Sequence, residues 1–212
     1  MNCFFLMAKG LGQLRTLRLH DNLLRGVPTA PMMLLTHLEH LTLGQNQMAS
    51  IPAHAFLGLT KLQQLDINSA NQLTSIDAHA LRFVFEFHFQ MQCPYLFWVC
   101  FKCFKWANWI AWIEYNSANS DLQSVQLVNC KKLSSLPDHV FSHSANLRRL
   151  SLRDNGLQSI PSQLAPWSQL DMVDLSGNPF NCKCDLLWLR NYLREISSST
   201  MVRSALLSSA LG

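Results

Sequence analysis

The chain has 212 residues, which is enough for one domain with a sizeable core. Its formal net charge is +4 and no basic run is longer than two residues, so the charge pattern does not favour nucleic acid or an anionic membrane surface as a partner. The seven cysteines are an odd number, from which no complete disulfide framework can be derived.

Residues 1–13 precede any regular pattern. The stretch from Cys3 to Ala8 is mildly apolar, but it is too short for the apolar region of a secretory signal and no charged region precedes it. We therefore expect only an N-terminal lead-in here.

A leucine pattern recurs from residue 14 onward, at intervals of 23 to 25 residues with one exception. Its copies open at Leu14, Leu38, Leu62, Leu122, Leu147 and Leu170. Within each copy two apolar residues alternate with polar neighbours, as Leu41 and Leu43 do, which is the period of a half-buried strand. This leucine spacing with a period of roughly 20–29 residues is typical of leucine-rich repeats. The sequence therefore predicts an α/β leucine-rich repeat solenoid, with a curved parallel sheet and irregular or short helical return segments.

A turn follows each predicted strand, and a short amide side chain there can satisfy buried backbone groups. The amide is present at Asn22, Asn46, Asn155 and Asn178. Cys130 takes this place in the fourth copy, and either Ala70 or Asn71 takes it in the third. A second apolar column is expected behind the sheet at Phe56, Leu81, Phe141 and Leu164.

The third and fourth copies start 60 residues apart, which leaves residues 82–116 outside the repeat. Deletion of these 35 residues restores the regular spacing between Leu81 and Leu122. The segment is foreign in composition and contains four of the six tryptophans of the chain. We favour a translated intron or gene-model error as its origin.

Three other interpretations of residues 82–116 remain open. The segment could be a genuine loop that folds over the array or binds a partner. Residues 95–113 have the length of a membrane helix, but Lys102 and Lys105 near the middle would each cost about 2.5–3.5 kcal/mol. A metal site would use His88, Cys93, Cys100 and Cys103, with only one closely spaced cysteine pair.

Residues 178–195 contain Cys182 and Cys184, followed by the apolar run Leu186-Leu187-Trp188-Leu189. This motif resembles the start of the cysteine-rich C-terminal cap of extracellular leucine-rich repeat proteins, such as receptor ectodomains and adhesion proteins. The resemblance implies that the segment covers the end of the core, and that both cysteines pair with downstream cysteines in an oxidising compartment. It ends near Glu195, so a truncated cap is expected, with no cysteine-rich cap before the first repeat.

The expected organisation has six parts. They are a lead-in (1–13), repeats one to three (14–81), the foreign segment (82–116), repeats four to six (117–177), the start of the cap (178–195) and a non-family tail (196–212).

No arrangement of residues indicates catalysis. There is no phosphate-binding glycine loop, and no motif places a nucleophile and a base together as a catalytic pair. Six histidines are expected at turn or return positions: His37, His40, His54, His79, His139 and His143. We expect no enzyme activity, no cofactor, no metal and no small-molecule substrate.

The outward strand positions are expected to form a polar concave face that binds a protein ligand. Four charged or titratable residues on it are candidates for partner binding: Arg18, His20, Asp66 and Arg153. The expected protein is a fragment of an extracellular, secreted or cell-surface receptor or adhesion protein, associated with a membrane only through a missing downstream segment. The alternative is a non-functional or aggregation-prone product of a mis-spliced or mis-predicted transcript.

Overall fold

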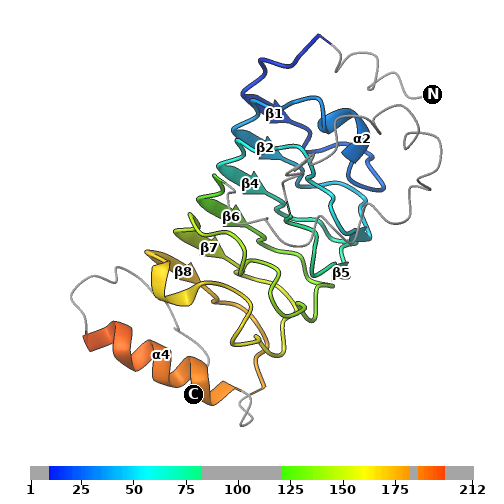
Figure 1. Ribbon diagram of the computed structural model, residues 1–212. Coiled ribbons are helices and arrows are strands. Elements are labelled where there is room, and N and C mark those ends of the chain that lie inside the picture. The colour runs from blue at the N-terminus through cyan, green and yellow to red at the C-terminus, as the bar shows by residue number, and fades with distance from the viewer. Residues whose placement is uncertain (1–9, 83–120, 182–185, 199–212) are drawn as a thin grey trace, which may run out of the picture.

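The computed structural model describes residues 10–82, 121–181 and 186–198 (Figure 1). Six strands form one parallel sheet in the order β1 (Thr16–Arg18), β2 (His40–Thr42), β4 (Gln64–Asp66), β6 (Ser124–Gln126), β7 (Arg149–Ser151) and β8 (Met172–Asp174). Each strand comes from a different repeat and lies beside the strands of the neighbouring repeats. The predicted leucine-rich repeat solenoid with a parallel sheet is therefore confirmed.

The sheet continues without a break across the irregular interval of the sequence. Gln64 of β4 pairs with Ser124 of β6, in the register that the other neighbouring strands share. Leu65 and Val125 consequently face the same core, where each is 1% exposed. Of segment 82–116 only Arg82 is among the described residues, so the hypotheses on its origin, loop function, membrane insertion and metal binding lie outside them and stay predictions.

The return segments lie on the opposite side of the core from this sheet (Figure 1). Two of them contain the short strands β3 (Ser50–Ile51) and β5 (Ser75–Ile76), which pair in parallel as a second sheet that the sequence analysis did not anticipate. Short helical returns, which were expected, occur near the two ends of the array. They are the helix α2 (Thr29–Met32) and the 3-10 helix η3 (Trp167–Gln169).

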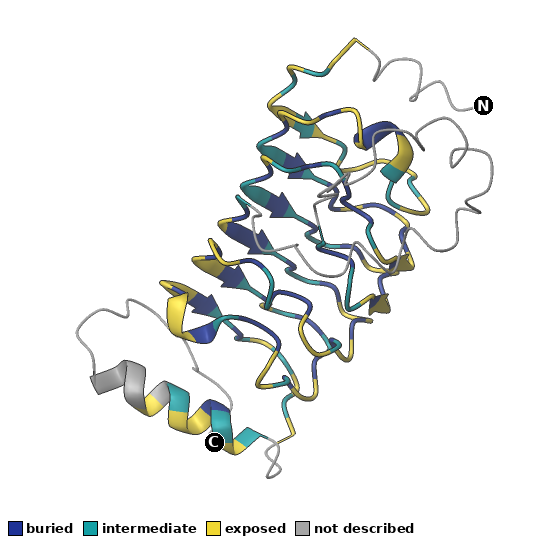
Figure 2. Cartoon of the chain, viewed as in Figure 1, coloured by how far each residue is buried: buried dark blue, intermediate teal, exposed yellow. Residues whose placement is uncertain are grey.

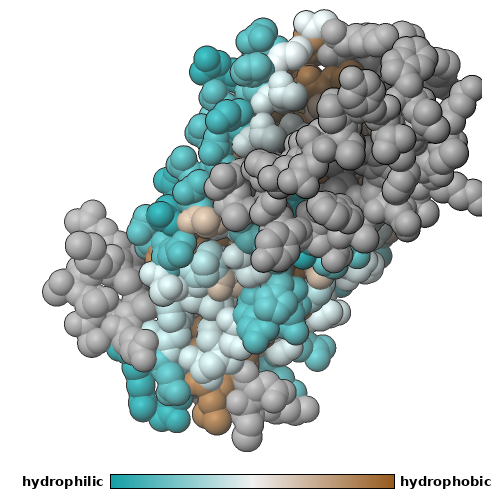
Figure 3. All heavy atoms as spheres, viewed as in Figure 1, coloured by the Kyte–Doolittle hydropathy of each residue, from teal (hydrophilic) through white to brown (hydrophobic). Residues whose placement is uncertain are grey.

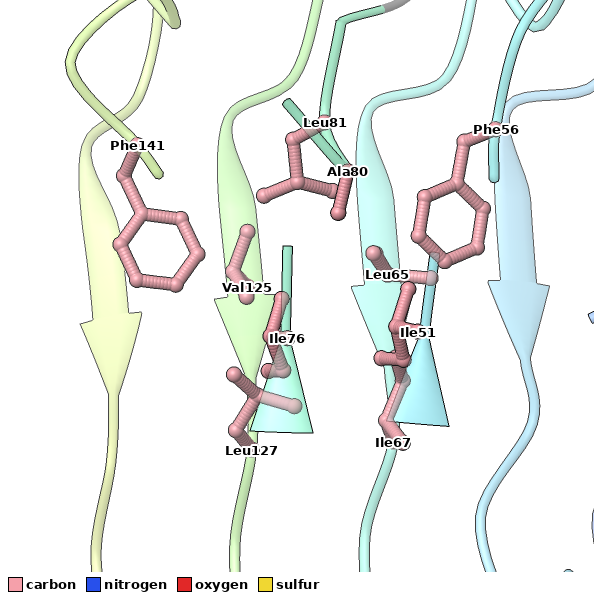
Figure 4. Close-up of a pocket in the computed structure, with 10 residues that line it drawn as sticks. All are labelled: Ile51, Phe56, Leu65, Ile67, Ile76, Ala80, Leu81, Val125, Leu127 and Phe141. Carbon is pink, nitrogen blue, oxygen red and sulfur yellow. The ribbon is translucent and has the colours of Figure 1, made fainter. Parts of the chain in front are cut away.

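The core fills the space between the six-stranded sheet and the returns (Figure 2). The predicted second column is buried there, with Phe56, Leu81, Phe141 and Leu164 at most 6% exposed. A cavity of about 10 Å³ remains beside Leu81, and Phe56 and Phe141 flank it (Figure 4). Its lining is entirely apolar, so a water molecule would find no hydrogen-bond partner in it.

A residue with left-handed backbone follows every strand of the large sheet, so the chain turns at the same place in each repeat. The six residues are Asp21, Gln45, Ser69, Asn129, Asp154 and Gly177, with φ between 55° and 69°. Asp, Asn and Gly adopt this conformation more readily than other residues do. In the third repeat the residue after it is Ala70, which is fully buried. Ala70 and not Asn71 therefore takes the place of the turn asparagine.

Helix α4 (Leu187–Ser198) covers the end of the last repeat (Figure 1). Its apolar residues at 188, 189 and 192 fall on one face at helical spacing. The Trp188 indole Nε1 donates a hydrogen bond to the Ile160 carbonyl at 3.1 Å, and the Tyr192 hydroxyl donates one to the Trp167 carbonyl at 2.9 Å. The helix thus supplies the apolar contacts that a further repeat would have made.

The cap cysteines Cys182 and Cys184 lie outside the described residues. Their pairing and the truncated cap, like the division of the chain into six parts, therefore remain predictions.

Candidate functional site

The outward-facing residues of the six-stranded sheet form a polar surface, which we call the outer sheet face. Side chains alternate along a strand, so every second residue points away from the core. The three rows that cross the face are Thr16, His40, Gln64, Ser124, Arg149 and Met172; Arg18, Thr42, Asp66, Gln126, Ser151 and Asp174; and His20, Gly44, Asn68, Val128, Arg153 and Ser176. Hydrophilic residues line the edge of the molecule along which β1 to β6 lie (Figure 3).

The first of these rows was not predicted from the sequence. The prediction that His40 lies at a turn or return position was wrong, because His40 is the first residue of β2 and lies half-buried on the outer sheet face. Each strand begins one residue before the pair of apolar residues that marks it. The row could have been predicted from the polar residue that precedes each apolar pair, since this residue continues the strand alternation, as in His40, Leu41 and Thr42.

The four predicted residues lie at different places on this face. His20 and Asp66 line one hollow over the C-terminal ends of β1, β2 and β4. Arg18 is exposed on β1 and pairs in register with Thr42, which also lines the hollow. Arg153 follows β7, and its Nε donates to Oδ2 of Asp154 at 2.9 Å. The structure therefore brings His20 and Asp66 together and leaves Arg153 apart from them.

The hollow has a volume of about 230 Å³ and spans three neighbouring repeats. It is lined by His20, Thr42, Gly44, Gln45, Asp66, Asn68 and Ser69. Gly44 lies at its centre and has no side chain, whereas its two neighbours in the row, His20 and Asn68, each have one. A Cβ atom on Gly44 would collide with the backbone of Asn68, so only glycine permits this approach of the two turns.

Internal hydrogen bonds hold the polar walls of the hollow. The His20 ring Nδ1 lies 3.3 Å from the Thr42 hydroxyl. On the opposite side Oδ1 of Asn68 accepts the Val128 N–H at 3.2 Å, and the Ser69 hydroxyl oxygen accepts a hydrogen bond from Asn129 Nδ2, also at 3.2 Å. These bonds join consecutive repeats, so the shape of the hollow is set by the stacking of the array.

Asp66 is the one carboxylate among the described residues that line the hollow. Its Oδ2 accepts a hydrogen bond from Gln64 Nε2 at 3.1 Å, while its Oδ1 is covered and has no hydrogen-bond partner within the described part of the chain. Burial raises the pKa of Asp66 above its ordinary value of 3.8, and the hydrogen bond from Gln64 and the charge of His40 oppose this effect. A half-buried carboxylate with incomplete pairing costs stability, and such groups cluster at functional sites.

Two kinds of feature are missing from residues 10–82, 121–181 and 186–198. These residues include no group of three His, Cys, Asp or Glu side chains placed to hold a metal ion. They also include no helix with the length and apolar character needed to cross a membrane.

A family model described as leucine rich repeat matches residues 12–73 and 120–180, which is more than half of the chain. Among curated proteins, the high affinity nerve growth factor receptor of Rattus norvegicus is 33% identical over 75 residues, 35% of this chain and 9% of the receptor. The transforming growth factor beta activator LRRC33 of Danio rerio is 40% identical over 67 residues, 31% of this chain and 9% of that protein. Human chondroadherin-like protein is 44% identical over 48 residues, 23% of this chain and 6% of its own length.

The fold is also that of a solved structure, described as the crystal structure of a TLR13–ssRNA13 complex. The match has a TM-score of 0.65 and 24% identity, and it covers 92% of this chain and 23% of the other. At this identity the likeness shows the fold alone. The chain spans less than a tenth of the length of each of the three curated relatives.

Proposed function

Because the chain belongs to the leucine-rich repeat family, we propose that it is a protein-binding module whose outer sheet face engages a protein ligand. It acts as part of a longer secreted or cell-surface protein of the receptor or adhesion type, and not as an enzyme. The rat relative, whose name identifies it as a receptor for a growth factor, supports this assignment. Stacked repeats offer an extended surface of this kind because their strands present side chains at regular intervals.

The observation that carries the proposal is the pattern of charge on the outer sheet face. Three arginines on it, Arg18, Arg149 and Arg153, are exposed. The two aspartates of the same face, Asp66 and Asp174, are only partly exposed and accept hydrogen bonds from neighbouring side chains. The charges offered to a partner are therefore mainly basic, and Arg18 makes no ion pair with any described residue. Exposed charges of this kind contribute more to partner choice and association rate than to folding.

The test is a binding screen of the full chain, displayed as a tetramer, against an array of secreted and cell-surface ectodomains. We expect a partner whose dissociation constant rises about tenfold or more in the Arg18→Glu variant and also rises with salt. Arg25→Glu is the matched control, because Arg25 is also exposed but lies in the return after β1, away from the face. Its affinity should equal that of the wild type.

Two outcomes would count against the proposal. A partner whose affinity is the same in Arg18→Glu, Arg153→Glu and Arg25→Glu would not be using the outer sheet face. A folded chain with no partner, or one that only aggregates, would favour the alternative of a non-functional transcript product.

A further inference from the structure

We propose that the hollow between His20 and Asp66 receives one basic side chain, a lysine or an arginine, from the protein partner, which pairs with the carboxylate of Asp66. This inference rests on the proposed function, since it specifies what the partner places at one point of the outer sheet face. It predicts that the partner presents one lysine or arginine at the hollow, surrounded by groups that contact the exposed arginines of the outer sheet face.

The shape of the hollow admits one side chain and little more. Its volume of about 230 Å³ is smaller than the roughly 300–1,000 Å³ of pockets that enclose whole small molecules. Its floor is backbone, because Gly44 contributes no side chain, and its rim is polar. A long flexible side chain with a charged head can reach such a floor while the rest of the partner stays on the strands.

The charge in the hollow selects a cation. Asp66 is the sole carboxylate among the described lining residues, and its only described hydrogen bond comes from the uncharged amide of Gln64. Rotation about the soft terminal torsion of Asp66 turns either oxygen toward the hollow. A single carboxylate is too few ligands for a divalent metal ion, which favours an ammonium or guanidinium group.

Asp174 lies in the same row of the sheet as Asp66, but its hydrogen bonds differ from those of Asp66. Its Oδ1 accepts both the backbone N–H of Ser176 at 3.1 Å and the hydroxyl of Ser176 at 2.6 Å. It does not line the hollow. The difference between the two aspartates is therefore the hollow beside Asp66 and the burial of its unbonded Oδ1, and Asp174 is the matched control.

The experiment titrates the full chain, carrying ¹³C-labelled aspartate, with capped single residues observed by NMR. The probes are N-acetyl-lysine N-methylamide and N-acetyl-arginine N-methylamide, with the uncharged N-acetyl-norleucine N-methylamide as control. We expect a saturable shift of the Asp66 carboxyl signal, with a dissociation constant of about 1–10 mM, and no shift at Asp174. The stronger of the two cationic probes identifies the side chain that the hollow prefers.

Two variants decide whether the shift reports this site. Asp66→Asn keeps the shape of the side chain and the hydrogen bond with Gln64 but removes the charge. It should weaken binding of the cationic probes at least tenfold. Binding to this variant is measured on the backbone amide signals of Gly44 and Ser69. Asp174→Asn should change it less than twofold. The inference is overturned if the cationic probes cause no saturable shift, if norleucine causes the same shift, or if Asp66→Asn binds as the wild type does. Failure of these titrations alongside a salt-sensitive partner in the ectodomain screen would reject the hollow and leave the proposed function standing.

Discussion

At the scale of single residues, the turn asparagines Asn46, Asn155 and Asn178 each link their repeat to the preceding one. In the fifth repeat Asn155 Nδ2 donates to the carbonyls of Leu127 and Leu152, both at 2.7 Å, while its Oδ1 accepts the N–H of Cys130 at 2.7 Å. The same arrangement recurs at Asn46 and Asn178. Because these backbone groups lie away from water, the amide supplies partners that solvent cannot.

We predict that Asn155→Ala lowers the free energy of unfolding by about 2–4 kcal/mol, since it leaves buried carbonyl and N–H groups without partners. Urea denaturation followed by circular dichroism measures the change. Asn22→Ala is the control: Asn22 is exposed and, within the described part of the chain, bonds only to the carbonyls of Leu19 and His20, so its replacement should cost less than about 1 kcal/mol. Equal costs in the two variants would show that the buried linkage between repeats is not what the amide contributes.

The fourth repeat has a thiol in place of this amide. Cys130 is fully buried, and its Sγ donates to the Ile67 carbonyl of the preceding repeat at 3.4 Å. Burial raises the pKa of this thiol above its ordinary value of 9.0, partly opposed by a backbone hydrogen bond from Ala70. The folded state therefore holds the thiol proton more tightly than the unfolded state does. The stability that this gives is complete below pH 9.0 and is lost as the pH rises from there through the raised pKa.

The reactivity of Cys130 follows from its burial and raised pKa. We predict that iodoacetamide at pH 8 modifies it about 100-fold more slowly in the folded chain than in 8 M urea, because only the thiolate reacts and the reagent must wait for local opening. Peptide mass spectrometry after timed quenching follows this cysteine separately from the other six. A native rate within threefold of the denatured rate would mean that the fourth turn opens freely.

At the scale of elements, helix α4 protects the open end of the array through an aromatic cluster. The ring centroids of Trp167 and Trp188 lie 5.0 Å apart, and those of Trp167 and Tyr192 lie 5.7 Å apart. The Trp167 indole donates to the Ser162 carbonyl at 2.8 Å, so the return of the fifth repeat is fixed to the same cluster. A solenoid needs such a cover because its last repeat has no neighbour to bury its apolar face.

We predict that Trp188→Ala destabilises the chain by about 3–5 kcal/mol, through loss of ring packing and of the hydrogen bond to Ile160. The loss should appear first in the sixth repeat, as faster amide hydrogen exchange in β8 than in β2, because each repeat depends mainly on its neighbours. Leu187→Ala serves as the control, since Leu187 is 53% exposed on the same helix and should change stability by no more than about 0.5 kcal/mol. Unchanged exchange in β8 would mean that α4 does not protect the end of the array.

At the scale of the whole molecule, the array is continuous although its sequence is not. β4 and β6 pair in full register, although their paired residues lie 60 positions apart in the sequence. The segments that follow these two strands are also joined, because the Val128 N–H donates a hydrogen bond to Asn68 Oδ1. The second apolar column also crosses the interval, from Leu81 to Phe141. Within the described residues, the two halves are therefore joined by contacts between the repeats.

This continuity leads to a prediction for the deletion of residues 82–116. The shortened chain should keep the same sheet and a melting temperature within about 4 °C of the full chain, because the deletion leaves Leu81 and Leu122 at the regular spacing. Deletion of residues 79–113 is a matched control: it removes the same number of residues and leaves the same downstream spacing, but it also removes the buried Ala80 and Leu81. That variant should melt at least about 5 °C lower. If the two deletions melt alike, the register at this junction is not what holds the halves together.

The fold could be predicted almost completely, and the site only in part. Inward residues such as Leu65 and Phe141 could be identified because hydrophobic periodicity is repeated within every copy. His20 and Asp66 could be selected individually as outward and polar. Their common hollow could not be, because it depends on Gly44 in the repeat between them and on how closely that turn approaches Asn68.

By itself the sequence determined the order of the strands in the large sheet, their inward apolar residues and the apolar columns, since these follow from a pattern contained in each copy. Only the tertiary structure decided which outward residues share a surface, that β3 and β5 form a second sheet, and that Ala70 takes the third turn position. It also decided the environment of Asp66, whose burial comes from repeats on both sides. The physical reason is distance along the chain: partners that lie 24 or 60 residues apart in sequence become neighbours only when the repeats stack.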